Sequence, residues 1–349
     1  MRLGVLDIGS NSAHLRVVDA CPGSPPLPVY RHKTPTKLGE AIGPDGAVDP
    51  TGVARLVDAV RAALGGARRQ QVVELIPFAT SAVRDAANRD EILRALAVEA
   101  QLAVGFLSGE DEARLTYFAA HRWYGWSTGP LLLLDIGGGS MEIAQGRDED
   151  PALAISLPLG AGRLTRSHLP DHPASRRQVK VLREYVREVL GPAVQRLHWE
   201  GRPHRAVATS KTFKQLAHFA GEADPAGTGQ RVIYRSDLKT WIPRLAAMSP
   251  AQRAELPGVS ASRARQLLAG AVVAATTMSA LGVDRLDVCP WALREGLLLR
   301  RMAPLPSPDA LRQVQLIQSI GAGVASLEQH RQVRGEERSS RVVVGGSGM

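Results

Sequence analysis

Two short segments of the chain share the pattern D-I-G-x-x-S, at residues 7–12 and 135–140. Each follows an apolar run and precedes residues that alternate between apolar and polar, which is typical of a β-hairpin that turns at the glycine. Backbone N–H groups in such a turn point into one hollow, where they can bind phosphate oxygens. The repeat therefore predicts two phosphate-binding turns, formed by Ser10, Asn11 and Ser12 and by Gly137, Gly138, Gly139 and Ser140.

Carboxylates flank both turns, namely Asp7, Asp135 and Glu142. A carboxylate beside bound phosphate is repelled unless a cation lies between the two, so this set predicts a divalent metal. Mg²⁺ is the natural candidate because it prefers oxygen ligands. The alternative is that the two aspartates only accept hydrogen bonds from the turn backbone. The spacing leaves both interpretations open.

The rest of the chain alternates between strand and helix patterns, which predicts an α/β fold. Expected helices cover residues 50–64, 84–100, 108–122, 175–190, 267–281 and 292–301, and expected strands cover 72–79, 103–107, 206–209 and 285–289.

A chain of 349 residues is long enough for about two domains. The stretch 123–130 (W-Y-G-W-S-T-G-P) is punctuated by glycine and proline just before the second hairpin and is the expected hinge. We therefore expect an N-terminal lobe at 1–125, a C-terminal lobe at 126–303 and an extension at 304–349. The last fifteen residues of that extension are rich in Gly, Ser and Arg and are expected to be disordered.

The composition favours a folded protein with an anionic partner. The net charge is +9 and arginine outnumbers lysine, which suits a polyanion, although a coding bias toward arginine would produce the same excess. Aromatic residues make up only 4%, so no stacking surface for nucleic acid is expected. Two cysteines, no secretory signal and no apolar stretch of about 20 residues predict a cytoplasmic protein without a membrane span.

Several common site types are excluded by pattern. No G-x-x-x-x-G-K-[ST] segment is present, so the chain has no Walker loop, and the glycines here lead into a strand, whereas those of a dinucleotide-binding fold lead into a helix. The nine histidines form no H-x-x-x-H, H-E-x-x-H or HD motif, so no zinc site or HD-type phosphohydrolase site is expected.

Five motifs in order resemble the exopolyphosphatase/guanosine pentaphosphate phosphohydrolase (Ppx/GppA) family, short form, of the actin-like phosphotransferase superfamily. They are L-D-I-G-S-N-S at 6–12, T-S-A-V-R-D-A at 80–86, S-G-E-D-E-A-R at 108–114, L-D-I-G-G-G-S-M-E at 134–142 and A-L-R-E-G at 292–296. The resemblance spans about residues 3–300.

The resemblance implies two ribonuclease-H-like (actin-like ATPase) domains facing an interdomain cleft, with a helix near 292–312 packing back on the first lobe. It also implies a Mg²⁺-dependent exopolyphosphatase that removes terminal orthophosphate from inorganic polyphosphate, and a homodimer. Because longer members continue into further helical domains, we expect this chain to prefer short polymers.

The resemblance also assigns roles to individual residues. Glu112 matches the general base that activates the attacking water, and Glu142 the second essential carboxylate. Asp135 matches the metal-associated aspartate and Arg84 the arginine that faces the phosphate chain, while the two turns match the phosphate loops. An acid in the first turn of a helix, as predicted for Glu112, is also a common partner of the helix dipole.

Two segments depart from the family pattern. Residues 208–213 read A-T-S-K-T-F where a G-x-S-G-T-like turn is common, and Pro290 and Trp291 precede the last motif where a glycine is common. Lys211 therefore either binds a phosphate as a point charge or lies on the surface. Trp291 is expected to pack and not to stack on a base.

Two other functions fit the same residues. One is a 5′-phosphohydrolase of guanosine pentaphosphate, an alarmone of the stringent response, and the other is a sensor that binds polyphosphate or an alarmone without hydrolysis. A kinase is disfavoured because a water-activating Glu112 would waste ATP. A sensor is disfavoured because extra carboxylates near a polyanion would only weaken binding.

Overall fold

The computed structural model describes residues 1–224 and 229–303. Contacts divide the described residues into one unit of residues 1–106 and 300–303, and a second unit of residues 107–299. The helix expected at 108–122 makes its contacts with the second sheet, and the predicted domain boundary at residue 125 stays a prediction. The predicted disorder at the C-terminus lies outside the described residues.

The first unit contains a five-stranded sheet in the order β3-β2-β1-β4-β5. β1 and β2 form the predicted hairpin, and β4 and β5 continue the sheet in the direction of β1. The strands are β1 (Arg2–Ile8), β2 (Ser12–Asp19), β3 (Pro28–Pro35), β4 (Glu74–Ala79) and β5 (Gly105–Phe106).

Helices α1 (Pro50–Arg69) and α3 (Arg89–Glu99) supply the apolar residues of this unit's core. The prediction of one helix over 84–100 is wrong, since a short α2 (Ser81–Arg84) precedes α3. Asn88 lies in the break, where its side chain accepts a hydrogen bond from the Val48 N–H and donates one to the Val48 carbonyl, both at 2.9 Å. This contact across 40 residues of sequence explains why local periodicity did not predict the break.

The second unit contains a seven-stranded sheet in the order β10-β11-β12-β9-β6-β7-β8. β6 and β7 form the second predicted hairpin, and β9 runs parallel to β6. The strands are β6 (Leu131–Ile136), β7 (Met141–Gly146), β8 (Leu153–Leu157), β9 (Arg205–Ala208), β10 (Glu222–Ala223), β11 (Arg231–Tyr234) and β12 (Arg285–Val288).

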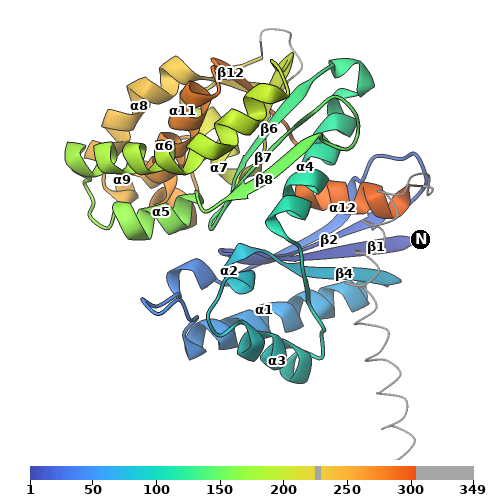
Figure 1. The fold of residues 1–349 in the computed structure, drawn as a ribbon. Helices are drawn as coiled ribbons and strands as arrows, with labels where there is room; N and C mark the ends of the chain where they lie inside the picture. The colour runs from blue at the N-terminus through green and yellow to red at the C-terminus, as the bar shows by residue number, and fades with distance from the viewer. Residues whose placement is uncertain (225–228, 304–349) are drawn as a thin grey trace, which may run out of the picture. The chain divides into compact units, whose positions relative to one another are not determined.

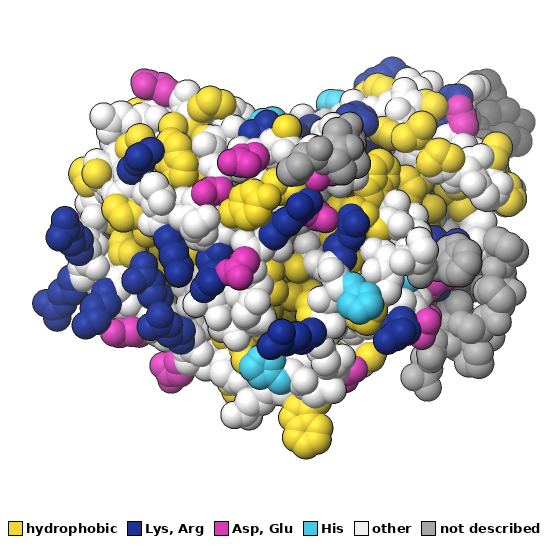
Figure 2. Space-filling model, turned by 90° about the horizontal axis from the view of Figure 1, so that it is seen from above, with side chains coloured by type: hydrophobic (Ala, Val, Ile, Leu, Met, Phe, Trp, Pro, Cys, Tyr) yellow, Lys and Arg dark blue, Asp and Glu magenta, His cyan; other side chains and the backbone are white. Residues whose placement is uncertain are grey.

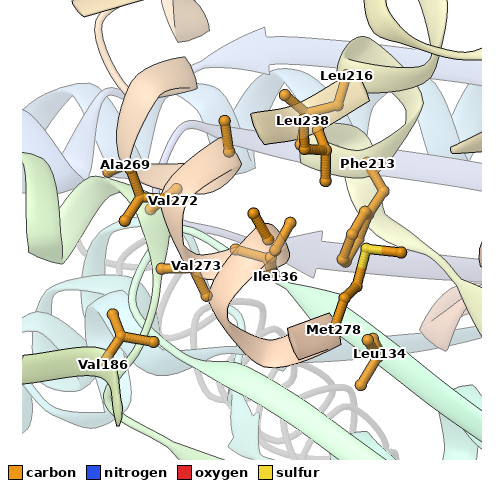
Figure 3. Close-up of a cluster of buried hydrophobic side chains, with 14 of the residues drawn as sticks. Leu134, Ile136, Val186, Phe213, Leu216, Leu238, Ala269, Val272, Val273 and Met278 are labelled. Atoms are coloured by element: carbon orange, nitrogen blue, oxygen red, sulfur yellow. The ribbon is translucent and has the colours of Figure 1, made fainter. Parts of the chain in front are cut away.

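Helices cover both faces of this second sheet (Figure 1). One face packs on α5 to α8 and α11 in a large core that includes Leu134, Phe213 and Met278 (Figure 3), and the other packs on α4. The helices of this unit are α4 (Gly109–Tyr124), α5 (Ala161–His168), α6 (Arg176–Trp199), α7 (Ser210–Ala220), α8 (Arg235–Ala247), α9 (Pro250–Ala254), α10 (Ala261–Ala264) and α11 (Leu267–Ala280).

The final described helix is α12 (Leu293–Met302). In its last turn Arg301 donates hydrogen bonds of 2.7 and 2.8 Å to Glu74 on β4. Residues 304–312 of the predicted helix lie outside the described residues.

The surface carries the excess of positive charge that the composition predicts. Figure 2 shows Lys and Arg side chains gathered at one end of the face seen from above. Within the described residues, no helix is both long enough and apolar enough to cross a membrane.

Candidate active site

The two D-I-G-x-x-S segments form the same turn. In the first, the Gly9 N–H donates to the Ser12 carbonyl at 3.1 Å, and in the second, the Gly137 N–H donates to the Ser140 carbonyl at 2.9 Å. Each turn joins two antiparallel strands. The repeat in the sequence is therefore a repeat of one hairpin, once in each unit.

The two hairpins differ at the residue opposite the aspartate. On the first hairpin Asp7 is opposite His14, and on the second Asp135 is opposite Glu142. Opposite residues of an antiparallel pair lie on the same face of the sheet. Only the second hairpin therefore places two carboxylates side by side.

These two carboxylates belong to a row of polar side chains across four strands. Ser156 is opposite Glu142 and donates a hydrogen bond of 2.9 Å to its Oε1. On the other side, Thr209 follows directly after β9 and donates a short hydrogen bond to Oδ2 of Asp135. The row Ser156, Glu142, Asp135 and Thr209, which we call the polar row, thus fixes both carboxylates through neighbouring hydroxyl groups.

The polar row lies on the α4 face of the sheet. Side chains alternate between faces along a strand, and Leu131 and Leu133 belong to the cluster that packs on α4, whereas Leu132 and Leu134 belong to the core on the other face. Asp135 continues the first of these series. The alternation therefore turns the carboxylates away from the main core and toward α4.

The first turn of α4 packs against the polar row. Ser108 caps this helix by accepting a hydrogen bond of 3.0 Å from the Asp111 N–H. A Cβ on Gly109 would lie only 2.3 Å from Ser156 Cβ, so only glycine permits this approach. Glu112, in the same first turn, is 7% exposed and belongs to the buried side of the helix. The structure thus brings Glu112, Glu142 and Asp135 to the same end of the second unit.

The surroundings of Asp135 disfavour its ionised form. Burial raises the pKa of this carboxyl above its ordinary value, despite the opposing effects of the hydrogen bond from Thr209 and the positive charges of Lys214, Arg263 and Arg294. The pKa is raised because the buried carboxylate has lost contact with water. A cation beside it would therefore stabilise the ionised form.

The glycine turn is held from one side by the start of α5. The carbonyls of Gly137, Gly138 and Gly139 accept hydrogen bonds from the Ala161 N–H at 3.0 Å, the Arg163 N–H at 2.9 Å and Arg163 Nε at 2.9 Å. Within the described residues, the N–H groups of Gly138, Gly139 and Ser140 donate no backbone hydrogen bond. The turn is thus oriented by its carbonyls and keeps donors available for an anion.

Gly160 sets the distance between α5 and the turn. A Cβ at this position would lie 2.2 Å from the Gly139 carbonyl carbon and 2.4 Å from the Ser140 nitrogen. We expect Gly160→Ala to destabilise the protein by about 1–3 kcal/mol, because rigid backbone must move. Urea unfolding measures this change.

Gly191→Ala is the matched control for this substitution. Gly191 lies inside α6 with open space around its Cβ position, and alanine there is expected to stabilise the protein by up to about 1 kcal/mol. Equal effects of the two substitutions would contradict the close packing of α5 on the turn.

The predicted residues of the first unit lie around its own turn. The Ser10 carbonyl accepts from the Gly39 N–H at 2.8 Å, and the Asn11 carbonyl accepts from two N–H groups at 3.1 and 3.2 Å. Arg84, at the end of α2, donates Nε to Asp85 at 3.1 Å. Because β1 and β4 are parallel neighbours, the turn and α2 follow the same sheet edge. This places the first turn and Arg84 at one end of the first unit.

Lys211 lies in the first turn of α7, and its side chain is exposed. The lysine whose charge acts on Asp135 is Lys214, one turn later, which also donates to the Pro290 carbonyl at 2.8 Å. Trp291 packs edge-on against Trp123 at 5.1 Å between ring centroids. The lysine of this segment whose charge is seen to act on Asp135 is therefore Lys214, and Lys211 stays a prediction.

The carboxylates fit a metal that is shared with a substrate. Among the described residues, no group of three or more His, Cys, Asp or Glu side chains could hold a metal ion. Asp135 and Glu142 supply oxygen donors from opposite positions of one hairpin. Mg²⁺ is often bound by one or two carboxylates together with substrate phosphates and water. Two carboxylates are therefore enough protein ligands for this ion.

Sequence reasoning missed Thr209 and Ser156. The sequence pattern predicts Thr209 only as the end of a strand and as part of the A-T-S-K-T-F segment, and it gives no role to Ser156. Both belong to the polar row only because of the strand order and register. The signal that pointed to Thr209 was its place directly after a buried strand.

Comparisons of the sequence with known proteins agree on one family. A model described as the Ppx/GppA phosphatase family matches residues 17–304. The chain is 44% identical over 345 residues to Exopolyphosphatase 1 of Mycobacterium tuberculosis, covering 98% of this chain and 100% of that protein. It is also 48% identical over 312 residues to an uncharacterized protein of Streptomyces coelicolor, covering 88% and 92%.

Solved structures resemble this fold. A Ppx/GppA family member from Aquifex aeolicus has a TM-score of 0.69 at 25% identity, covering 86% of this chain and 96% of that chain. An exopolyphosphatase from Cytophaga hutchinsonii has a TM-score of 0.76 at 23% identity, covering 86% and 98%, and supports the fold alone.

Proposed function

The chain belongs to the Ppx/GppA phosphatase family, and from this premise we propose that it is an exopolyphosphatase. It hydrolyses the terminal phosphoanhydride bond of inorganic polyphosphate and releases orthophosphate. The single observation that carries the proposal is the burial of Glu112 in the turn of α4 that packs on the row holding Asp135 and Glu142. The 44% identity to a whole Exopolyphosphatase 1 supports the same reaction.

Glu112 is the proposed general base. In this role its carboxylate accepts a proton from a water molecule, whose oxygen forms a bond to the terminal phosphorus. The bond from that phosphorus to the bridging oxygen breaks, and the shortened chain leaves with the electron pair. A positioned general base contributes about 10²–10⁴-fold to such a rate. Packing of α4 against Ser156 keeps Glu112 in position.

The two turns and two basic side chains are the proposed phosphate-binding groups. In the second unit these are the donors of residues 137–140 and Lys211, and in the first unit residues 10–12 and Arg84. Backbone N–H groups and cations offset the negative charge that spreads over the phosphoryl oxygens during transfer. The interdomain cleft that would bring the two sets together stays a prediction.

Asp135 and Glu142 are the proposed ligands of Mg²⁺, with Asp7 as a further candidate on the first hairpin. When bound, the ion offsets negative charge on the phosphoryl oxygens. Thr209 and Ser156 fix the two carboxylates by donating to the Oδ2 of Asp135 and the Oε1 of Glu142.

Orthophosphate release by the purified protein tests the proposal. The substrates to compare with Mg²⁺ are short polyphosphate, long polyphosphate, guanosine pentaphosphate and ATP. Release from polyphosphate is the expected result. Release from guanosine pentaphosphate alone would instead establish the alarmone phosphohydrolase, and binding without release from any of the four would establish the sensor.

Short chains are the proposed preference. In the described part of the second unit, the cations that act on Asp135 are Lys214, Arg263 and Arg294, and we propose that they offset the charge of only the last few phosphates of a chain. Added length therefore contributes little binding energy at this site. Turnover on polymers of a few phosphates should exceed turnover on polymers of several hundred, measured as orthophosphate per enzyme at equal chain-end concentration. Faster release from the long polymer would contradict this preference.

A cytoplasmic homodimer is the proposed form of the protein, as the family resemblance implies. Guanosine pentaphosphate and tetraphosphate are proposed as further ligands of the same site. Light scattering coupled to size exclusion measures the oligomeric state, and competition against polyphosphate hydrolysis measures alarmone binding.

A further inference from the structure

Arg253, on α9, is the largest side chain that the described part of the protein buries completely. Its Nε donates a hydrogen bond of 2.9 Å to the Leu245 carbonyl, and its Nη1 donates one of 3.4 Å to the Arg265 carbonyl. The Nη2 nitrogen is buried as well, and it has no hydrogen-bond partner among the described residues. Two N–H groups of a buried guanidinium are therefore left without an acceptor.

The positive charge of Arg253 has no opposite charge beside it. Burial lowers the pKa of the guanidinium to about 10, and no carboxylate acts against this shift. The side chain is thus still charged at neutral pH. The Leu245 carbonyl, in the last turn of α8, offsets part of the charge, as the C-terminal end of a helix does for a cation. A buried ion nevertheless remains costly unless it is paired, so the surroundings of Arg253 favour an anion.

His172 brings further unpaired polar atoms to the same region. It lies in the loop 169–175 between α5 and α6, and both of its ring nitrogens are buried without a partner among the described residues. Burial and the charges of Arg253 and Arg265 lower the pKa of this imidazole. Because the charge of Arg253 acts on the ring, the two side chains lie near each other. The imidazole supplies at least one N–H donor whichever tautomer it adopts.

Hydrogen bonds to the backbone hold this loop beside α9. The Ala174 N–H donates at 2.9 Å to the carbonyl of Ala246, which directly follows the residue whose carbonyl accepts from Arg253. At the other end of the loop, Nη2 of Arg265 donates to the Pro170 carbonyl at 3.5 Å. The ends of α8 and α10 therefore fix the loop where the unpaired donors of α9 are buried.

Cations outweigh the single carboxylate that acts on His172. Asp171 is that carboxylate, and its effect on the pKa of His172 is smaller than the effects of burial and the two arginines. Asp171 is exposed, and its Oδ2 accepts a hydrogen bond of 2.9 Å from Gln178 at the start of α6. It thus pairs with another element and leaves the donors of Arg253 unmatched.

We propose that Arg253 and His172 form a binding site for a small monovalent inorganic anion such as chloride. Nη2 of Arg253 and one ring nitrogen of His172 donate to the ion. One guanidinium compensates one negative charge, so a divalent anion such as hydrogen phosphate would leave a negative charge buried, which is strongly disfavoured. The ion would hold the loop after α5, the helix whose first residues bind the carbonyls of the glycine turn.

Crystals of the full chain grown in sodium bromide test the site directly. Bromide replaces chloride and is located by its anomalous scattering. We expect a bromide ion within hydrogen-bond distance of Arg253 Nη2 and of one ring nitrogen of His172. A water molecule alone at this position, or no density there, would overturn the proposal and leave Arg253 only as a cap of α8.

Thermal unfolding tests the same site in solution. At equal ionic strength, sodium chloride should raise the melting temperature of wild type by about 2–4 °C more than sodium gluconate, because a ligand of the native state stabilises it. Arg253→Met and His172→Phe should both lose this difference. His172→Phe keeps an aromatic ring in place and remains informative if Arg253→Met does not fold.

Arg187→Met is the matched control for these variants. Arg187 is exposed on α6, so its replacement removes the same charge from the surface and should leave the effect of chloride intact. Equal stabilisation by chloride in wild type, Arg187→Met and His172→Phe would mean that chloride only screens surface charge, and would overturn the site.

A further variant separates this site from the exopolyphosphatase reaction. Glu142→Gln should abolish phosphate release but keep the full effect of chloride, so the anion site and the proposed reaction can fail independently. Sodium phosphate in place of sodium chloride should give no stabilisation that depends on His172. A larger stabilisation by phosphate that His172→Phe removes would overturn the assignment to a monovalent ion.

Discussion

Orthophosphate release from polyphosphate falls about 10²–10⁴-fold in Glu112→Gln, while polyphosphate binding persists. The amide keeps the size and hydrogen-bonding capacity of the side chain but cannot accept a proton from water, so the loss measures general-base catalysis. Glu112 is buried at the start of a capped helix, and its replacement by glutamine removes a charge without leaving a cavity. Steady-state assays measure phosphate release. Direct titration with polyphosphate, under conditions without turnover, measures binding.

Glu110→Gln is the control for this prediction. Glu110 lies in the same helical turn but is exposed and pairs with Arg114 at 2.7 Å. It shares with Glu112 any interaction with the helix dipole, which favours acids in a first turn. A similar loss in both variants would mean that the acids only stabilise the start of α4 and that Glu112 is not the base.

The second large effect is expected for Asp135→Asn, which lowers Mg²⁺-dependent phosphate release by about 10²–10³-fold. Asparagine keeps an oxygen to accept the hydrogen bond from Thr209 but loses the negative charge that would hold the cation. Mg²⁺ should raise the melting temperature of wild type, because a ligand that binds only the native state stabilises it. The same ion should leave the melting temperature of Asp135→Asn unchanged.

The same substitution should stabilise the protein when no metal is present. Burial raises the pKa of Asp135 above 3.8 in the folded protein. Well below pH 3.8 the carboxyl is neutral in both states. As pH rises through the folded pKa, the unfolded chain is already ionised and the folded state loses stability. Asp135→Asn avoids this loss, so its melting temperature in EDTA should exceed that of wild type at pH 7.

The difference between the two proteins should shrink as pH falls toward 4. Asp148→Asn, an exposed aspartate in the loop after β7, is the control and should show no such dependence. A melting temperature of Asp135→Asn below that of wild type at pH 7 in EDTA would show that the ionised carboxylate stabilises the fold, contrary to this argument.

The hairpins that carry the candidate site were predictable because their determinants are local. Apolar residues before the D-I-G-x-x-S pattern and alternation after it define strand, turn and strand, and the structure confirms both hairpins. The capped helix that begins after Ser108 was predictable for the same reason. The α/β class and the family followed from these motifs.

What could not be predicted depends on contacts between distant segments. Thr209 acts on Asp135 across 74 residues, and Ser156 reaches Glu142 only because β8 pairs with β7 in one particular register. The break at Asn88 likewise arises from a contact with Val48. No periodicity in the sequence reports such pairings, so a pattern could identify the carboxylates but not the hydroxyl groups that orient them.

The alternation along the second hairpin has a consequence for how this protein can evolve. Asp135 and Glu142 lie between residues such as Leu134 and Ile143 that fill the opposite face. A deletion of one residue from the glycine turn would shift the register by one and place a carboxylate where an aliphatic side chain belongs. Selection would remove such a deletion because the protein would not fold, whatever its effect on catalysis. New specificities can therefore arise at this turn by substitution and not by a change in loop length.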